Sequence, residues 1–256
     1  MILDQIVKVK KKEVEESKTV YPLSALREGI KNMAPARNFK KALLDQECAI
    51  IAEVKRKSPS RGTIRKDFDP LEIAEEYEKN GAAAVSVLTD EPFFGGKKEF
   101  LTKIKGKILL PVLRKDFIID PYQVYETKRL GADAVLFIAR LLKKELPSYV
   151  RLAAALDLFP LVEVHSEEDL DLALAAGAEL IGINNRDLGT FATGLETSLK
   201  LAPLVPKGRV VIAESGIRSR REVEILMQTG IHAFLVGETL MKADNISEKL
   251  KELRGG

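Results

Sequence analysis

Residues 50–64, with the sequence IIAEVKRKSPSRGTI, place two charged side chains in an otherwise apolar segment. Glu53 and Lys55 are two residues apart, and residues two apart on a strand face the same side. A carboxylate and an ammonium group therefore project together from the end of a strand that otherwise has core composition. A loop rich in proline, serine and glycine follows at once. Opposite charges at the end of a core strand, beside such a loop, indicate an active site.

Other polar residues follow apolar ones by the same step of two. Lys115 follows Leu113, and Glu163 follows Leu161. The remaining members of this set are Asn184, Arg186 and Glu214. Because buried charges cost several kcal/mol unless they are paired, a purely structural scaffold is not expected to accumulate them. Lysine with glutamate favours general acid–base chemistry, although Lys115 could instead be the nucleophile of a Schiff-base aldolase.

Two further features indicate what such a site would bind. Glycine-bearing turns at 214–216 and 237–238, the second followed by a short helical pattern over 239–242, are typical of phosphate sites. Phe93 and Phe94, in the loop 91–96, suggest an apolar wall for a planar group, with packing against the N-terminal helices as the alternative. The polar loop 56–65 has the composition of a movable lid. The set suits a substrate with a phosphate, a second anion and a flat ring.

The elements that position these residues alternate along the chain. Strand patterns occupy residues 49–55, 84–89, 108–115, 134–139, 160–165, 180–185, 209–215 and 233–237. Helical patterns occupy residues 70–80, 97–104, 121–130, 143–156, 166–176, 195–204, 219–228 and 245–254. This repeat predicts an α/β fold, a (β/α)8 TIM barrel with its site at the carboxyl ends of the strands. A doubly wound sheet is the alternative, but no G-x-G-x-x-G follows the first strand.

We expect one domain over residues 1–256. It consists of a barrel over 49–256 and an N-terminal helical extension over 1–48 that covers the bottom of the barrel or part of its mouth. The basic run at residues 8–12 is expected to be a solvated helix face, and His165 and His232 are expected to be structural. A net charge of +3 without a long basic tract gives no reason to expect a nucleic-acid partner.

Composition excludes several other classes of protein. Cys48 is the only cysteine, so disulfide frameworks and cysteine zinc sites are excluded. No residues have metal-ligand spacing, and we expect neither a metal nor a cofactor. No apolar run approaches the ~20 residues that span a bilayer, and no signal-peptide core is present. We therefore expect no membrane association and a cytoplasmic location. Abundant lysine and glutamate lean toward a thermophilic source.

Several motifs identify a family. The E-x-K and S-P elements of residues 50–64 are joined by LRKDFI (113–118), LVEVH (161–165), GINNRDL (182–188), AESGI (213–217) and VGETLM (236–241). The chain closely resembles the indole-3-glycerol phosphate synthases of tryptophan biosynthesis. The resemblance implies a carboxy-lyase without a cofactor or metal. Its partner would be one small phosphorylated, anthranilate-derived substrate, 1-(2-carboxyphenylamino)-1-deoxyribulose 5-phosphate, which it would convert to indole-3-glycerol phosphate, CO2 and water. We expect a monomer, with a dimer left open.

The resemblance also implies catalytic roles. Lys115 would be the general acid that protonates the ketone oxygen during ring closure. Lys55 would pair with the carboxylate that leaves as CO2. Glu163 would be the base in the dehydration, with Glu53 as the alternative. Glu53 and Asn184 would also hold the amine and hydroxyl groups of the substrate, and Ser215 would help to complete the pocket.

Further residues would bind the substrate. Those expected at the phosphate are Ser58 and the backbone N–H groups of Gly216, Gly237 and Glu238. Those expected to line the ring pocket are Phe94, Phe117 and Leu136. Pro59 would lie in the lid, Glu214 would complete the pocket, and Arg186 would add positive charge and fix neighbouring carboxylates.

Two alternatives remain open. The first is another phosphate-binding barrel enzyme, either the Schiff-base aldolase or a phosphoribosylanthranilate isomerase. The isomerase is disfavoured because its acid–base pair is expected to be a cysteine and an aspartate, whereas Cys48 precedes the first strand. The second is an inactive or engineered barrel that binds phosphates without turnover.

Overall fold

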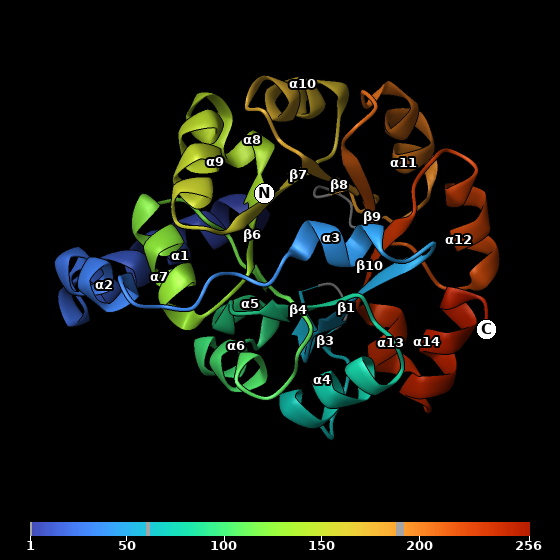
Figure 1. The fold of residues 1–256 in the computed structure, drawn as a ribbon, viewed down its shortest axis with the longest axis horizontal. Coiled ribbons are helices and arrows are strands. Elements are labelled where there is room, and N and C mark those ends of the chain that lie inside the picture. Colours follow the sequence, from blue (N-terminus) through green and yellow to red (C-terminus); the bar gives the residue numbers. More distant parts are fainter. Residues whose placement is uncertain (1, 60–61, 188–191) are drawn as a thin grey trace.

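Eight parallel strands close into a barrel, seen from its amino-terminal end in Figure 1. The structure is a computed structural model that describes residues 2–59, 62–187 and 192–256. Neighbouring strands follow the order β1-β10-β9-β8-β7-β6-β5-β4 around the closed barrel. Their bounds are β1 (Ala49–Val54), β4 (Ala84–Leu88), β5 (Val112–Lys115), β6 (Ala134–Ile138), β7 (Phe159–Val164), β8 (Leu180–Asn184), β9 (Val210–Glu214) and β10 (Ala233–Val236). The predicted TIM barrel is confirmed.

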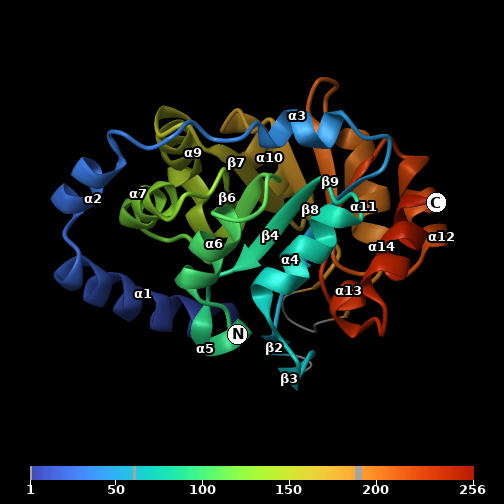
Figure 2. The same ribbon diagram turned by 60° about the horizontal axis from the view of Figure 1, so that its bottom comes forward.

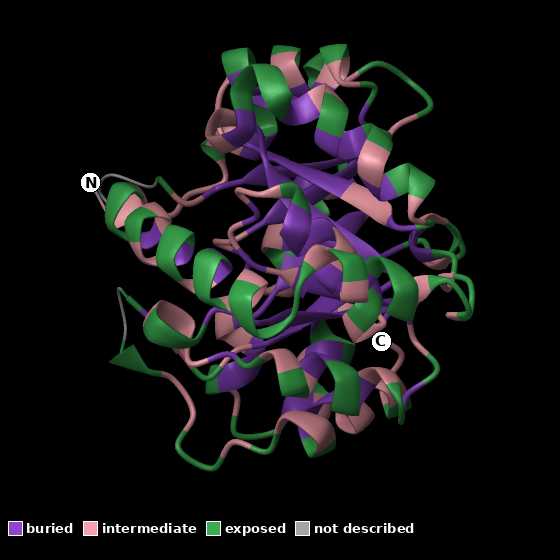
Figure 3. Ribbon diagram, turned by 90° about the vertical axis from the view of Figure 1, so that its left-hand side faces the viewer, coloured by how far each residue is buried: buried purple, intermediate pink, exposed green. Residues whose placement is uncertain are grey.

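Helices surround the barrel and cover its outer face. The outer helices are α4 (Pro70–Lys79), α6 (Lys98–Lys105), α7 (Pro121–Leu130), α9 (Leu146–Ala155), α10 (Glu167–Ala175), α11 (Glu196–Leu201), α12 (Arg220–Met227) and α14 (Ile246–Arg254). Pro70 and Pro121 occupy first-turn positions, where the missing N–H costs no hydrogen bond. In Figure 3 the buried residues follow the strands and the inner faces of the helices, and the exposed residues lie outside.

Short elements occupy several of the connections. They are a hairpin of β2 (Lys57–Ser58) and β3 (Gly62–Thr63), the helices α5 (Glu91–Phe94), α8 (Ala139–Leu142) and α13 (Glu238–Lys242), and the 3-10 turns η1 (Lys143–Glu145) and η2 (Ala202–Leu204). Only the turn of helix at α13 was expected from the sequence. The 3-10 turns occupy the start of the expected helix 143–156 and the end of the expected helix 195–204, so both α-helices are shorter than predicted.

The strand expected over 108–115 begins only at Val112. Pro111 has no N–H to donate to a strand ladder, and Leu109 is exposed to solvent. Apolar composition alone was misleading here, because Leu109 and Leu110 precede the barrel as a connecting segment.

The strands alternate between two apolar layers. Ile51, Leu113 and Leu161 pack inside the barrel, whereas Ile50 and Val162 pack outside against the helices. Glu53, Lys115 and Glu163 come two residues after inner positions of their strands. The period of two therefore carries each polar side chain to the carboxyl end of the barrel.

The N-terminal extension covers both ends of the barrel rather than one. Helix α3 (Phe39–Leu44) crosses the amino-terminal end, where Phe39 and Leu43 are completely buried among the inner residues. Helix α1 (Ile2–Val20) lies at the opposite end, beside the β2–β3 hairpin, and α2 (Leu23–Ile30) projects to one side (Figure 2). Among the residues that the structure describes, no helix has the length and apolar content needed to cross a membrane.

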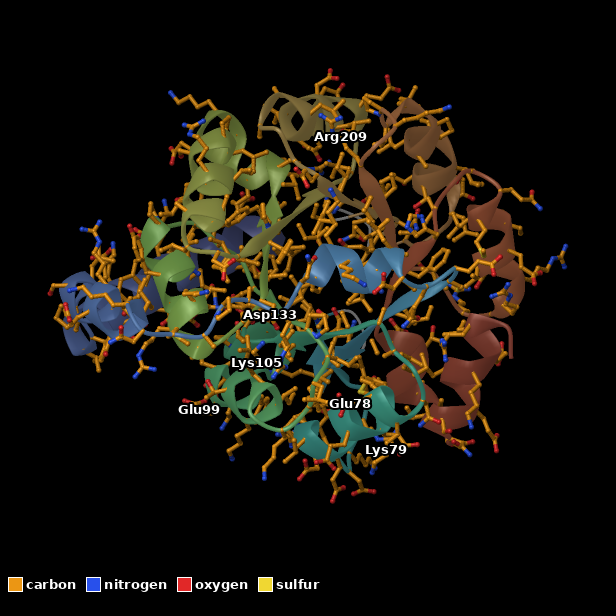
Figure 4. All side chains as sticks on the ribbon, in the orientation of Figure 1. Glu78, Lys79, Glu99, Lys105, Asp133 and Arg209 are labelled. Carbon is orange, nitrogen blue, oxygen red and sulfur yellow. The ribbon has the colours of Figure 1, made fainter. Side chains whose placement is uncertain are left out.

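A buried carboxylate fixes the segment that leads into α3. Asp133 is fully buried and accepts hydrogen bonds from the backbone N–H groups of Arg37 (2.6 Å) and Val112 (2.7 Å). Lys105 Nζ lies 2.5 and 2.6 Å from its two oxygens. Figure 4 labels Asp133 and Lys105 on the face that α3 covers. This end of the barrel is therefore closed by structural contacts, and the opposite end is left for a site.

Candidate active site

A cavity of about 310 Å³ lies at the carboxyl ends of the strands. Of the residues predicted for the site, all except Phe93 line it, so the fold brings together side chains that are far apart in the sequence. The members of this set are Glu53, Lys55, Ser58, Pro59, Phe94, Lys115, Phe117, Leu136, Glu163, Asn184, Arg186, Glu214, Ser215, Gly216, Gly237 and Glu238. In the lid, Ser60 and Arg61 lie outside the described residues. The roles of the set remain predictions.

Lys115 is at the centre of the charged groups. Its Nζ lies 2.7 Å from Glu163 Oε2 and 3.3 Å from Glu214 Oε2. Burial alone would lower the pKa of Lys115, but the charges of Glu163, Glu214 and Glu53 outweigh it and hold that pKa well above its usual value. Lys115 is therefore an ammonium group at neutral pH.

The two carboxyl groups beside Lys115 differ in their protonation. Burial raises the pKa of Glu163, but Lys115 and His165 outweigh burial and bring it to about 2. Burial and the charge of Glu163 raise the pKa of Glu214 to about 8, although Lys115 opposes them. At neutral pH Glu163 is therefore ionised and Glu214 holds a proton. Neighbouring carboxyl groups with separated pKa values are typical of acid–base sites.

Glu53 and Lys55 form an ion pair of 2.6 Å at the end of β1. Space for the two inner carboxylates comes from glycines on neighbouring strands. A Cβ atom at Gly237 would overlap Glu53 Oε1, and one at Gly182 would overlap Glu214 Oε1. A side chain at either glycine would therefore displace the neighbouring carboxylate from its place in the site.

The end of the cavity near Gly216 and Gly237 has the features of an anion site. Ser215 and Gly216 have positive φ angles of 66° and 78°, and the carbonyl of Ser215 accepts a hydrogen bond from Asn185 Nδ2 (3.2 Å). A non-glycine residue in this conformation is uncommon and is often found at functional sites.

Cations also gather at this end. Glu238 Oε1 pairs with Lys242 Nζ at 2.6 Å, and Glu238 Oε2 pairs with Arg186 Nη2 at 3.2 Å. Arg218 and Lys242 line the cavity, but sequence reasoning missed them. The available signal was that each follows a glycine turn by a few residues.

Apolar groups line another part of the cavity. The rings of Phe94 and Phe117 lie 5.9 Å apart between centroids, with 36° between their planes, and Leu136 also lines the wall. Phe93 is not among the lining residues. Ile2, Leu3 and Ile6 of α1 line the cavity too, and they were missed although their spacing is that of one helix face.

The chain is similar to known proteins of one family. A family model described as "Indole-3-glycerol phosphate synthase" matches residues 3–253. Proteins of that name from Alkaliphilus metalliredigens and Carboxydothermus hydrogenoformans are 50% and 45% identical to this chain. The alignments cover 100% and 99% of this chain, respectively, and 99% of each relative. The chain belongs to the indole-3-glycerol phosphate synthase family. The predicted family is confirmed.

Solved structures with much lower sequence identity share the barrel fold of this chain. A 3-hexulose-6-phosphate synthase aligns with a TM-score of 0.65 at 14% identity, over 80% of this chain and 98% of its own. A thiamine phosphate pyrophosphorylase from Pyrococcus furiosus aligns with a TM-score of 0.61 at 18% identity, over 82% and 96%. At such identities the likeness concerns the barrel alone.

A buried cluster of charged side chains around Lys10 holds helix α1 over the site. Lys10 Nζ lies 3.0 Å from both Asp90 Oδ2 and Asp116 Oδ1, and 2.6 Å from Glu13 Oε2. The expectation that residues 8–12 form a solvated face is wrong at Lys10, which is only 3% exposed. Because Asp90 and Asp116 follow β4 and β5, the cluster fixes α1 against the carboxyl ends of these strands.

We predict that Lys10→Met lowers the free energy of unfolding by about 3–5 kcal/mol at pH 7, because it removes the ammonium group from the buried Asp90 and leaves Asp116 with only Arg114. Lys11→Met, at the neighbouring exposed position, is the control and should change it by less than about 0.5 kcal/mol. Urea unfolding measures both. Equal stabilities of the two variants would contradict the role given to the cluster.

The same cluster predicts a pH dependence. Burial raises the pKa of Asp116, but Lys10 and Arg114 outweigh it and lower that pKa from 3.8 to about 2. A lowered folded-state pKa contributes stability that is present above pH ~4 and is lost as pH falls toward 2. The loss of Lys10 should bring this pKa back toward its usual value. The difference in free energy of unfolding between the wild type and Lys10→Met should therefore become smaller as the pH falls from ~4 toward 2.

Proposed function

We propose that this protein catalyses the indole-3-glycerol phosphate synthase reaction, using Lys115 as general acid. The observation that carries this proposal is the position of the buried Lys115 ammonium group, whose Nζ lies 2.7 Å from Glu163 and 3.3 Å from Glu214. It faces a cavity with an aromatic wall and, elsewhere, glycine turns beside cations. These parts match a flat ring, a reacting carbonyl and a phosphate, which the proposed substrate carries on one molecule.

In the proposed ring closure, the ring carbon that bears the carboxylate attacks the ketone carbon, and Lys115 gives its proton to the ketone oxygen. Glu163 and Glu214 hold the lysine in place throughout. A proton donor placed at the oxygen where charge develops stabilises the transition state.

In the proposed decarboxylation, Lys55 pairs with the substrate carboxylate and fixes the ring. The bond between the ring and the carboxylate breaks, CO2 leaves, and the electron pair restores the aromatic ring. Lys55 pairs with Glu53 in the structure, so the substrate carboxylate would compete with an existing partner. Lys55 would therefore pair with Glu53 before the substrate binds and with the substrate carboxylate afterwards, so its ammonium group would have an anionic partner in both states.

In the proposed dehydration, the hydroxyl formed in the first step leaves as water after it takes up a proton from solvent. Glu163 accepts the proton from the adjacent carbon, and the new double bond completes the indole. The ionised state of Glu163 supports the base role. Glu53 remains the alternative base, and Asn184 is proposed to hold the hydroxyl groups.

The remaining predicted residues complete the proposed binding site. Phe94, Phe117 and Leu136 would hold the ring, with Pro59 in the lid. Ser58 and the backbone N–H groups of Gly216, Gly237 and Glu238 would bind the phosphate. Arg186, Glu214 and Ser215 would complete the pocket. We propose that this small substrate is the protein's partner, and that the protein works as a cytoplasmic monomer without nucleic acid.

Two observations weigh against the alternative enzymes. A Schiff-base lysine needs a neutral amine, whereas the neighbouring carboxylates raise the pKa of Lys115. Cys48, the one thiol that an isomerase pair could use, does not line the cavity, and its Sγ lies 3.7 Å from the carbonyl oxygen of Leu253.

The reaction can be followed by fluorescence because the chain contains no tryptophan. Added 1-(2-carboxyphenylamino)-1-deoxyribulose 5-phosphate should give new indole emission over a background that comes only from the protein's tyrosines. Buffer without protein is the control. A folded preparation that produces no indole emission would refute the proposed function.

Lys115→Ala should lower kcat by roughly 100-fold or more, since a general acid contributes about 10²–10⁴-fold. Lys103→Met removes an exposed lysine of α6 and should leave kcat within about twofold of the wild type. Both rates are read from indole emission at saturating substrate. Near-normal turnover of Lys115→Ala would assign the acid role to another group.

Lys55→Met should weaken substrate binding by roughly 10-fold or more, because a hydrogen bond to a charged group contributes about 1.5–3 kcal/mol. Binding of the product, which has lost the carboxylate, should change much less. Calorimetry with the product and KM for the substrate separate the two effects, and Lys66→Met, at an exposed position, is the control. An equal loss of affinity for both compounds would exclude the proposed pairing with the carboxylate.

A further inference from the structure

His165 lies against the catalytic base proposed above but does not line the cavity. Its Nε2 is 3.3 Å from Glu163 Oε1, and its side chain is 5% exposed. The other oxygen of the same carboxylate, Oε2, lies 2.7 Å from Lys115 Nζ. The two oxygens of Glu163 therefore have different neighbours, one at the reacting lysine and one at the imidazole.

The imidazole is in turn fixed by the first turn of α10. Asp169 Oδ2 lies 3.7 Å from His165 Nδ1 and accepts a hydrogen bond of 2.9 Å from the His165 backbone N–H. The same oxygen accepts a hydrogen bond of 2.8 Å from Arg140 Nε of α8. Ser166 caps this helix by accepting a hydrogen bond from the Asp169 N–H (3.2 Å). The main chain of His165 is thus anchored to α10, and the Asp169 carboxylate lies beside the imidazole ring.

Beyond the imidazole there is a separate hollow at the surface, which His165 also lines. Its charged groups belong to α10 and α11, and they are Glu167, Glu168, Glu196 and Lys200. Lys200 pairs with Glu167 at 2.7 Å. Glu163 therefore faces His165 from the active site. The other charged groups around His165 are Asp169 with its partner Arg140, and the residues of the surface hollow.

We propose that His165 is a positioning residue, which holds Glu163 Oε1 so that Oε2 is directed toward Lys115 and the substrate. This inference rests on the base role proposed for Glu163. A carboxylate held at one oxygen cannot rotate its other oxygen away from the reacting atoms, and catalytic groups require such support from their neighbours. The sequence predicts a structural role for His165, and this proposal differs from that prediction by giving His165 a role that acts through Glu163.

His165→Leu removes the contact and His165→Gln retains an N–H donor on a side chain of similar reach. We expect His165→Leu to lower kcat about tenfold or more with a smaller change in KM, because the lost contact matters most in the transition state. His165→Gln should recover much of this loss. The matched control is His232→Leu, since His232 does not line the cavity.

A second measurement does not depend on turnover. In protein labelled with ¹³C at glutamate carboxyl groups, NMR titration of the unliganded protein follows Glu163. The His165 contact helps to lower the pKa of Glu163, so His165→Leu should move the titration midpoint upward and His232→Leu should not. If His165→Leu fails to fold, His165→Asn makes the same test, because its amide is too short to reach Glu163.

The outcomes separate the two proposals. A folded His165 variant with wild-type kcat and an unchanged Glu163 titration would overturn the positioning role. A wild-type protein that makes no indole would refute the proposed function, and the titration would still show whether His165 holds the Glu163 carboxylate.

Discussion

The placement of one ammonium group between two buried carboxyl groups sets the requirements for the rest of this structure. Lys115 could not remain charged at the end of an apolar barrel without Glu163 and Glu214, because an unpaired buried charge costs several kcal/mol. Because two carboxyl groups share one cation, the state of lowest free energy retains a proton on one of the two carboxyl groups. The arrangement that stabilises the charge therefore also places two carboxyl groups with different pKa values within 3.3 Å of the ammonium nitrogen of Lys115.

Closing the barrel is what makes this arrangement geometrically available. β5, β7 and β9 contribute Lys115, Glu163 and Glu214, and these strands meet only because the closed barrel points their carboxyl ends at one cavity. The carboxylates fit because Gly182 and Gly237 leave the space that a Cβ atom would occupy. Helix α1 then covers the apolar part of the mouth and is itself held by Lys10. The site is thus held together by the ion pairs of Lys115 inside the cavity and by the ion pairs of Lys10 beside it.

Local periodicity was sufficient to predict part of the site, and the remainder depended on tertiary contacts. The step of two from Ile51 to Glu53 and Lys55 is visible in the sequence, and so are the repeated strands that imply a barrel. The burial of Lys10 is not visible, because its carboxylate partners Asp90 and Asp116 lie far along the chain. The late start of β5 at Val112 was also missed. The apolar residues 108–111 have the composition of a strand, but in the fold they connect α6 to β5.

The same reasoning explains why the two carboxyl groups at Lys115 differ. Glu163 is closer to the ammonium than Glu214 is, at 2.7 Å rather than 3.3 Å, and its neighbours His165 and Asn184 also lower its pKa. Glu214 shares the same lysine but faces the negative charges of Glu163 and Glu53. The extra partners therefore direct the proton to Glu214 and leave Glu163 ionised. On this argument the residues behind the carboxylate determine which of the two groups can serve as the proposed base, since the lysine itself contacts both.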